Sequence, residues 1–230
     1  MSIVDHLSEL RTRLVWVLGA LALGTTLGWH YRFALRHTIQ APIAPYPLVF
    51  LKPAEALMVN MKIAFAAGVL FTLPILIYHT LAFCLPGSGS KLQKKIWITS
   101  ALGTVFFAIG CAFGLTVALP TTLKFLLSFA DPSLVPQLSV DYYFSFALGM
   151  TLVFGLTFEL PLFMWMAGSL GLISHRVLRH NRKYAILILS IVAAILTPPD
   201  VVSQMLLLGP LLVLYEIGIW LVYVSQREGL

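Results

Sequence analysis

The fold is decided by residues 144–172, which read FSFALGMTLVFGLTFELPLFMWMAGSLGL. This stretch holds one charged side chain, Glu159. A bilayer core requires roughly 20 consecutive apolar residues in a helix. The stretch is therefore long enough to cross a membrane, and it predicts that the chain is embedded in one.

Composition extends this conclusion to the whole chain. Of the 230 residues, 59% are hydrophobic and 10% are charged, whereas soluble domains contain about 45–50% and about 25% of these classes. These proportions exclude a soluble globular enzyme, a disordered chain and a disulfide scaffold. They leave an all-α, polytopic membrane protein, which we expect to form a single integral membrane domain over residues 1–230.

Six apolar segments are the expected membrane helices, and the fifth of them is short. At about 1.5 Å per residue it is only about 20 Å long, so four full helices plus a re-entrant hairpin is the alternative. The prolines in residues 30–56 predict an extended connection, and Thr121–Phe129 is expected to form a short interfacial helix. Pro74, Pro161 and Pro210 are expected to kink their helices. The six segments are residues 14–29, 57–81, 96–119, 144–172, 184–196 and 201–224.

Basic residues set the expected orientation. The net charge is +6, and the bases lie in short tracts between apolar runs, which favours loops facing lipid and cytoplasm over a nucleic-acid partner. Ten bases fall on one set of connections and four on the other. The positive-inside rule therefore predicts that both termini are cytoplasmic.

No nucleophile motif, zinc spacing or phosphate-binding loop occurs in the sequence, so we expect no catalytic residue, cofactor or metal. Two acids are the candidates for function. Glu9 precedes Arg13 by one helical turn, and it is expected either to receive a cationic ligand or to form a surface pair of little energy with Arg13. The second candidate is Glu159, because a carboxylate at membrane depth costs at least about 2.5–3.5 kcal/mol.

Pro161 adds to the polarity around Glu159. It lacks an N–H, which leaves the carbonyl of Thr157 without its usual helical donor. Glu159 is therefore expected to dock a polar group of another helix or to relay protons, unless it is satisfied inside its own bundle. Gln204, Glu216 and Lys62 are weaker candidates of the same kind, and Glu55 is expected to pair with Lys52 or Lys62.

In several places the sequence resembles the TatC family, the core receptor subunit of the twin-arginine protein translocase. The opening His6-Leu-Ser-Glu-Leu-Arg-Thr-Arg13 is similar to the HLxELRxR pattern of that family. The other matching stretches are Pro53-Ala-Glu55, the Phe83 and Pro86 step, Phe154-Gly-Leu-Thr-Phe-Glu-Leu-Pro161, Leu196-Thr-Pro-Pro-Asp-Val-Val-Ser-Gln204 and Tyr215-Glu-Ile-Gly218. These motifs occur in order over nearly the whole chain, which makes the resemblance specific.

The resemblance implies a cup-shaped bundle of six helices with short fifth and sixth helices in the bacterial cytoplasmic membrane. It also implies a function without covalent chemistry. The chain would bind twin-arginine signal peptides at the cytoplasmic face and recruit single-helix TatA/TatB-type subunits. It would then export folded proteins with the proton-motive force, as an oligomer with itself and its partners.

The resemblance also implies roles for individual residues. The family places a second glutamate in the first cytoplasmic loop, and counting without gaps puts Leu92 at that position, followed by Gln93 in place of a customary arginine. The implied signal-peptide residues are Glu9, Arg11, Arg13, Phe83, Leu92, Gln93 and Lys94. The implied polar positions for partner helices are Glu159, Gln204 and Glu216. The implied structural residues are Pro42, Glu55, Pro86, Pro161, Pro198, Pro199 and Asp200.

Two other functions remain open from the residues alone. The first is a proton-coupled small-solute transporter that uses Glu159 and Glu216 as a relay, although the sequence shows no internal repeat to support it. The second is an intramembrane enzyme, which would need another catalytic group facing Glu159.

Overall fold

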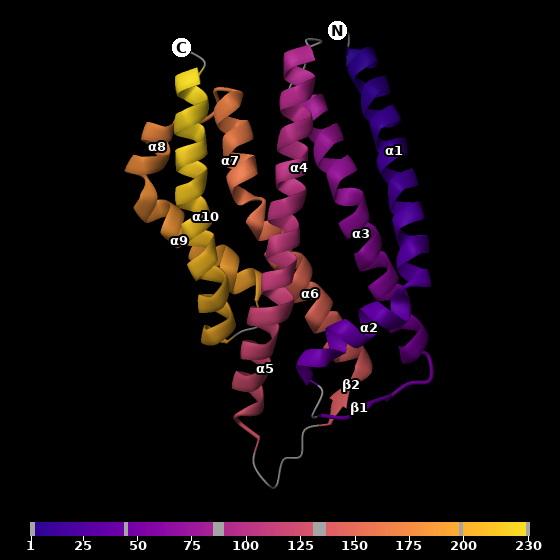
Figure 1. The fold of residues 1–230 in the computed structure, drawn as a ribbon. Coiled ribbons are helices and arrows are strands. Elements are labelled where there is room, and N and C mark those ends of the chain that lie inside the picture. The colour runs from indigo at the N-terminus through magenta and orange to yellow at the C-terminus, as the bar shows by residue number, and fades with distance from the viewer. Residues whose placement is uncertain (1–2, 44–45, 85–89, 131–136, 198–199, 229–230) are drawn as a thin grey trace. The chain divides into compact units, whose positions relative to one another are not determined.

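The computed structural model describes residues 3–43, 46–84, 90–130, 137–197 and 200–228 (Figure 1). These residues form α-helices, two short strands and two irregular helical turns. The elements are α1 (Ile3–His30), α2 (Arg32–Gln40), η1 (Ala41–Ile43), β1 (Leu48–Val49), α3 (Glu55–Cys84), α4 (Ser90–Phe113), the π-helical η2 (Gly114–Ala118), α5 (Leu119–Leu127), β2 (Leu138–Ser139), α6 (Val140–Phe158), α7 (Leu160–Ser169), α8 (His175–His180), α9 (Arg182–Leu196) and α10 (Val201–Glu228).

Length and hydropathy mark five membrane-crossing stretches among these residues: Leu7–His30, Glu55–Phe83, Ile96–Leu127, Val140–Ser169 and Val201–Arg227. The fifth expected segment is α9, which has 15 residues and is therefore only about 22 Å long. It is short, as the sequence predicts. The sixth helix is not short, because α10 runs for 28 residues with Pro210 inside it.

The backbone contacts group the chain into two compact units. The first comprises Met1–Val105 with Val135–Gly149, and the second comprises Phe106–Leu134 with Met150–Leu230. The expected single membrane domain over residues 1–230 stays a prediction.

In the first unit, α1 and α3 lie side by side and antiparallel (Figure 1). Two glycines of α1 allow this approach. A Cβ added at Gly28 would lie 2.6 Å from the carbonyl oxygen of Ala64, and one added at Gly24 would lie 3.0 Å from that of Gly68. Small residues at such crossings let helix backbones pack closely in a membrane, where the hydrophobic effect does not hold helices together.

The other end of the first unit is held by polar contacts. Strands β1 and β2 pair in parallel, with Leu48 opposite Leu138. Glu55 is buried at the start of α3 and accepts hydrogen bonds from the Leu51 N–H and the Ser139 hydroxyl, both at 3.3 Å.

No described ion pair joins Glu55 to Lys52 or Lys62, so the expected pairing was wrong. Lys62 donates instead to Asp141 at 2.6 Å and to Ser145 at 2.8 Å. The physical reason is that Asp141, in the first turn of α6, offers Lys62 a carboxylate that is 37% exposed, while Glu55 is buried and bonded to uncharged donors.

In the second unit, α10 packs against α7 and α9. It runs parallel to α7, since Met164 packs with Ile219 and Val222 and the hydroxyls of Ser169 and Ser225 lie 3.2 Å apart. A buried hydrogen bond of 2.8 Å joins Thr122 on α5 to Ser203 on α10.

The three prolines within apolar segments behave differently. Pro161 coincides with the break between α6 and α7 at Glu159, as its missing N–H predicts. Pro74 and Pro210 lie inside α3 and α10, which continue through them. The carbonyl of Pro74 is bonded to the Ser100 hydroxyl at 2.7 Å, so a neighbouring helix supplies a polar contact at that point.

Two expectations for the connections need correction or lie outside the described residues. Residues 30–56 are not simply extended, because α2 forms before the first proline of that stretch, Pro42, which lies in η1. The short helix expected over Thr121–Phe129 is α5, which η2 joins directly to α4, so that it continues the apolar stretch Ile96–Leu127 and is not a separate helix. Its interfacial position stays a prediction. Pro86, Pro198 and Pro199 lie outside the described residues.

Candidate functional site

The first candidate site is the carboxylate of Glu9 near the start of α1. The Nε and Nη2 atoms of Arg13 donate to its Oε1 atom at 2.9 and 2.5 Å. The i,i+4 spacing on a helix brings the two side chains together. Within the described part of the chain, Oε2 accepts no hydrogen bond, and the Glu9 side chain is 29% exposed. One carboxylate oxygen is therefore held and the other is open to a ligand.

Arg13 also ties α1 to α3. Its Nη1 atom lies 3.3 Å from Nδ1 of His79, and its Nη2 atom lies 3.5 Å from the carbonyl oxygen of Ala82. A pair confined to one exposed helix face would be worth little. Here the guanidinium bridges two helices, so it fixes the position of Glu9 relative to α3.

A small cavity of about 140 Å³ adjoins this pair between α1 and α3. Phe83, one of the predicted site residues, lines it together with Arg13. The rest of the lining consists of two polar residues, His79 and Thr80, and of four aliphatic ones, Leu10, Leu14, Val17 and Leu76. The polar pair of the site thus lies against an apolar wall.

The other predicted signal-peptide residues are not gathered around Glu9 by any described contact. Arg11 is exposed, and two residues along a helix place it about 200° away from the Glu9 direction. Gln93 and Lys94 are exposed in the first turns of α4. Leu92 lies in α4, but its side chain is outside the described residues.

Sequence reasoning missed His79. The residue is one turn before Phe83 on α3, so it shares a face with a motif residue, and it is a polar side chain in an otherwise apolar stretch. That spacing could have identified it. Its contact with Arg13 needs the antiparallel register of α1 and α3, which the sequence alone does not supply.

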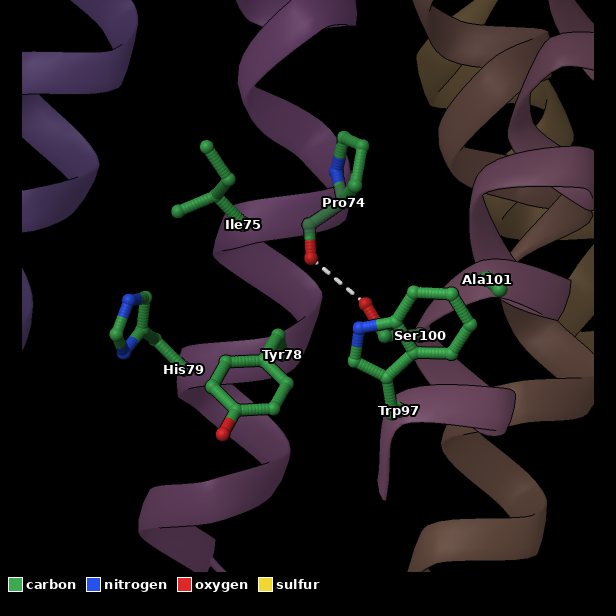
Figure 2. Close-up of a pocket in the computed structure, with 7 residues that line it drawn as sticks. All are labelled: Pro74, Ile75, Tyr78, His79, Trp97, Ser100 and Ala101. Carbon is green, nitrogen blue, oxygen red and sulfur yellow. Dashed lines mark hydrogen bonds between the residues drawn. The ribbon is translucent and has the colours of Figure 1, made fainter. Parts of the chain in front are cut away.

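A larger cavity of about 440 Å³ lies between α3 and α4, and His79 lines it as well (Figure 2). Tyr78 and Trp97 contribute aromatic rings, and Ser100 lies on the side of Pro74 (Figure 2). His79 therefore lines both cavities. The smaller one lies on the α1 side of α3 and the larger one on the α4 side.

The second candidate site is Glu159, the residue between α6 and α7. Its side chain is 3% exposed, and neither carboxylate oxygen has a hydrogen-bond partner in the described residues. Its backbone carbonyl accepts from the N–H groups of Leu162 and Phe163 at 3.0 and 3.1 Å. Buried polar groups are normally satisfied, so this carboxyl has unused capacity for a hydrogen-bonding partner.

The remaining polar candidates have partners inside the second unit. Gln204 donates to the carbonyl oxygen of Ser190 at 3.2 Å, which joins α10 to α9. Glu216 pairs with Arg182 at 2.6 Å, and both side chains are about half exposed. Asp200 caps α10 by accepting from the Ser203 N–H at 2.7 Å. No described hydrogen bond joins Glu159 to Glu216, as a relay between them would require.

Comparison with known proteins adds a family match. The family model described as Sec-independent protein translocase protein (TatC) matches residues 5–210. The relative from Carboxydothermus hydrogenoformans is 34% identical over 99% of this chain and 96% of its own length. The one from Aquifex aeolicus is 35% identical over 99% of this chain and 97% of its own length. Both are named Sec-independent protein translocase protein TatC.

A solved structure matches as well. The crystal structure titled as the twin-arginine translocase receptor TatC superposes with a TM-score of 0.82 at 33% identity, covering 96% of this chain and 100% of the other. This match confirms the predicted all-α, six-helix membrane fold. The relatives are named as transport components, which is consistent with a chain that performs no catalysis, and they give the small-solute transporter no support.

Proposed function

The chain belongs to the TatC family of Sec-independent protein translocase proteins, and on that premise we propose that it binds twin-arginine signal peptides through Glu9. The observation that carries this proposal is that Arg13 binds one of the two oxygens of the Glu9 carboxylate and leaves the other without a described partner. Arg13 engages Oε1, and Oε2 accepts no hydrogen bond within the described residues. A guanidinium is the natural partner of a carboxylate oxygen, because its N–H groups are fixed in a planar fork.

Arg13 acts in this proposal as a positioning residue. It holds one oxygen of Glu9 and is itself placed by His79 and the Ala82 carbonyl. The carboxylate therefore presents its second oxygen in a fixed direction. The positions of Leu92, Gln93 and Lys94 at the start of α4, and of Phe83 at the end of α3, supply the rest of the proposed peptide-binding surface, with Arg11 as an exposed flank.

The test is site-specific photocrosslinking from positions 92 and 94 to a signal peptide, with a Lys-Lys peptide as the matched control. We expect crosslinks that depend on Arg-Arg and that are lost in Glu9→Gln. Equal crosslinking of Arg-Arg and Lys-Lys peptides by the unsubstituted protein would overturn the proposal.

The proposal has a second part, which concerns Glu159. We propose that it receives a polar side chain from a single-helix subunit of the TatA or TatB type, with Gln204 and Glu216 on α10 as further polar positions in the same unit. Support comes from the two unpartnered oxygens of a buried carboxyl. An interhelical hydrogen bond in a membrane contributes about 0.6–2 kcal/mol, which suits reversible recruitment.

The proposal also covers the membrane location, the orientation and the assembly of the chain, and the energy source for export. Both termini lie in the cytoplasm, the chain forms one membrane domain in the bacterial inner membrane, and it assembles with itself and its partners. Folded cargo then crosses with the proton-motive force. The charge asymmetry of the connections supports the orientation. Labelling of single cysteines at positions 8 and 225 from the outside of intact cells tests it, and rapid labelling at either position would contradict it.

A further inference from the structure

A basic segment of the second unit is not used by the proposed function. Residues 160–199 contain four Lys and Arg residues and no Asp or Glu, and all four bases fall between Arg176 and Lys183. This segment forms α8 and the first turn of α9. Arg182 is neutralised, because it pairs with Glu216 at 2.6 Å. The other three bases are exposed, and none of them makes a hydrogen bond or an ion pair within the described part of the chain.

Helical spacing places the exposed bases on one face. Arg176 precedes Arg179 by three positions and His180 by four, and side chains at these spacings are neighbours on a helix. Lys183 follows in the first turn of α9, where its ammonium lies 5.1 Å from the centre of the Tyr184 ring. We call the surface formed by Arg176, Arg179, His180 and Lys183 the basic face.

The opposite side of α8 is fixed against α10 (Figure 1). Leu178 packs against the apolar cluster of α7 and α10, and its carbonyl accepts from the Tyr215 hydroxyl at 2.9 Å. The Gln226 side chain lies 2.9 Å from Nδ1 of His175 and donates to the carbonyl of Ile173 at 3.1 Å. Two successive helical positions differ by about 100°, so Leu178 and Arg176 point in nearly opposite directions. These contacts therefore turn the basic face away from its own unit.

Exposed apolar side chains border the basic face. Leu172 is 73% exposed, Val177 is 53% exposed and Tyr184 is 55% exposed. After Lys183, α9 continues with further exposed apolar residues, which are Ile186, Leu187 and Ile188. Bases next to apolar side chains are typical of the boundary between lipid headgroups and acyl chains.

We propose that the basic face binds the phosphates of anionic phospholipids such as phosphatidylglycerol. The planar fork of an arginine suits two phosphate oxygens at once. Near an anionic membrane surface, each Lys or Arg strengthens the attraction about fivefold. An excess of bases is enough to orient a chain, whereas a lipid site needs them unpaired, on one face and fixed in place, as they are here. The face lies in the second unit, and its lipid binding does not require a peptide at Glu9.

The test is lipid capture by a photoreactive residue at position 177, which lies beside the basic face. The full chain is placed in liposomes of equal parts phosphatidylglycerol and zwitterionic phosphatidylcholine, and the adducts are identified by mass spectrometry. The positional control is a photoreactive residue at position 195, because Ile195 is 76% exposed near the other end of α9. Thermal unfolding of every variant shows whether the protein is still folded.

Three variants separate the basic face from net charge. The first removes the face: Arg176→Gln, Arg179→Gln and Lys183→Gln. The matched control loses the same charge on other connections: Arg32→Gln, Arg36→Gln and Lys124→Gln. The third keeps the charge of the face through Arg176→Lys and Arg179→Lys, so it should bind lipid even if the first variant unfolds.

We expect capture at position 177 to favour phosphatidylglycerol about tenfold, since salt screens part of the attraction of three bases. The first variant should lower this ratio to that of position 195, whereas the matched control and the lysine variant should keep it. A ratio near one in the unsubstituted protein would overturn the proposal, as would an equal loss in the first variant and the matched control. In membranes that contain single-helix subunits, capture of protein and no lipid at position 177 would also overturn it, because the face would then bind protein.

Discussion

Two buried glutamates of this chain differ in one respect that fixes the sign of their mutational effects. Glu159 is 3% exposed and neither carboxylate oxygen has a partner in the described residues. Glu55 is 8% exposed and accepts from the Leu51 N–H and the Ser139 hydroxyl. We predict that Glu159→Leu stabilises the isolated protein and that Glu55→Leu destabilises it.

The magnitudes follow from the hydrogen bonds. A buried polar group without a partner costs about 1–3 kcal/mol, and Glu159→Leu removes that cost while it keeps an apolar side chain of similar size. Glu55→Leu removes a charged acceptor from two donors, each bond being worth about 1.5–3 kcal/mol. For a chain of this length, 1 kcal/mol corresponds to roughly 2–4 °C in Tm. The two variants should therefore shift Tm in opposite directions, each by several degrees.

The assay is thermal unfolding of the purified protein in detergent, followed by intrinsic fluorescence and by the fraction that stays monodisperse. The same preparations are tested for recruitment of the single-helix partner, which Glu159→Leu should weaken about threefold to thirtyfold, the equivalent of 0.6–2 kcal/mol. Signal-peptide binding should be retained. Glu159→Gln, which keeps a hydrogen-bonding group, should recover part of the recruitment.

Two results would refute this reasoning. Destabilisation by Glu159→Leu as large as that by Glu55→Leu would mean that the Glu159 carboxyl is satisfied inside its own chain. A stabilised Glu159→Leu protein that recruits its partner normally would confirm that the carboxyl is unsatisfied and would refute its docking role.

Four further substitutions test the helix packing, the cap of α10 and the Glu9 site. Gly28→Ala brings a Cβ within 2.6 Å of the Ala64 carbonyl oxygen and should destabilise the protein by about 1–2 kcal/mol after the gain in helix propensity. Gly19→Ala on the same helix, with nothing within 4 Å, should be neutral or stabilising in the same unfolding assay, and equal behaviour of the two would contradict the close packing. Asp200→Ala removes the cap on α10 and should lower the unfolding free energy by about 1 kcal/mol; an unchanged Tm would show that the cap is dispensable. Leu92→Glu should strengthen binding of Arg-Arg over Lys-Lys peptides in a titration, and unchanged or weaker binding would mean that this loop differs in organisation from the family pattern.

The apolar segments could be predicted because length and hydropathy are enough to identify a membrane helix in a sequence. The break at Pro161 was predictable for the same local reason, since a missing N–H acts within one turn. The sequence predicts that Glu159 lies in the middle of a helix, whereas the structure places it between α6 and α7. The carboxyl without a described partner therefore lies at a break in the helix and not within a continuous one.

The contacts between distant segments could not be predicted. Lys62 lies only seven positions from Glu55 in the sequence, yet it pairs with Asp141, 79 positions away. His79 gave no strong sign of its contact with Arg13, 66 positions away. Such pairings depend on the register between helices. In a membrane the pattern of apolar residues does not determine this register, because lipid and protein neighbours are equally apolar.

The same physics explains why the position of Glu9 depends on only a few contacts of α1. Only 6% of the most apolar stretch of α1 is buried within the protein, and exposed leucines there gain nothing by leaving lipid for a protein surface. The helix is therefore positioned by the close backbone contacts at Gly28 and by the guanidinium of Arg13. Substitutions at these two positions should move Glu9, whereas substitutions among the exposed leucines of α1 should not, even though the leucines contribute most of its surface.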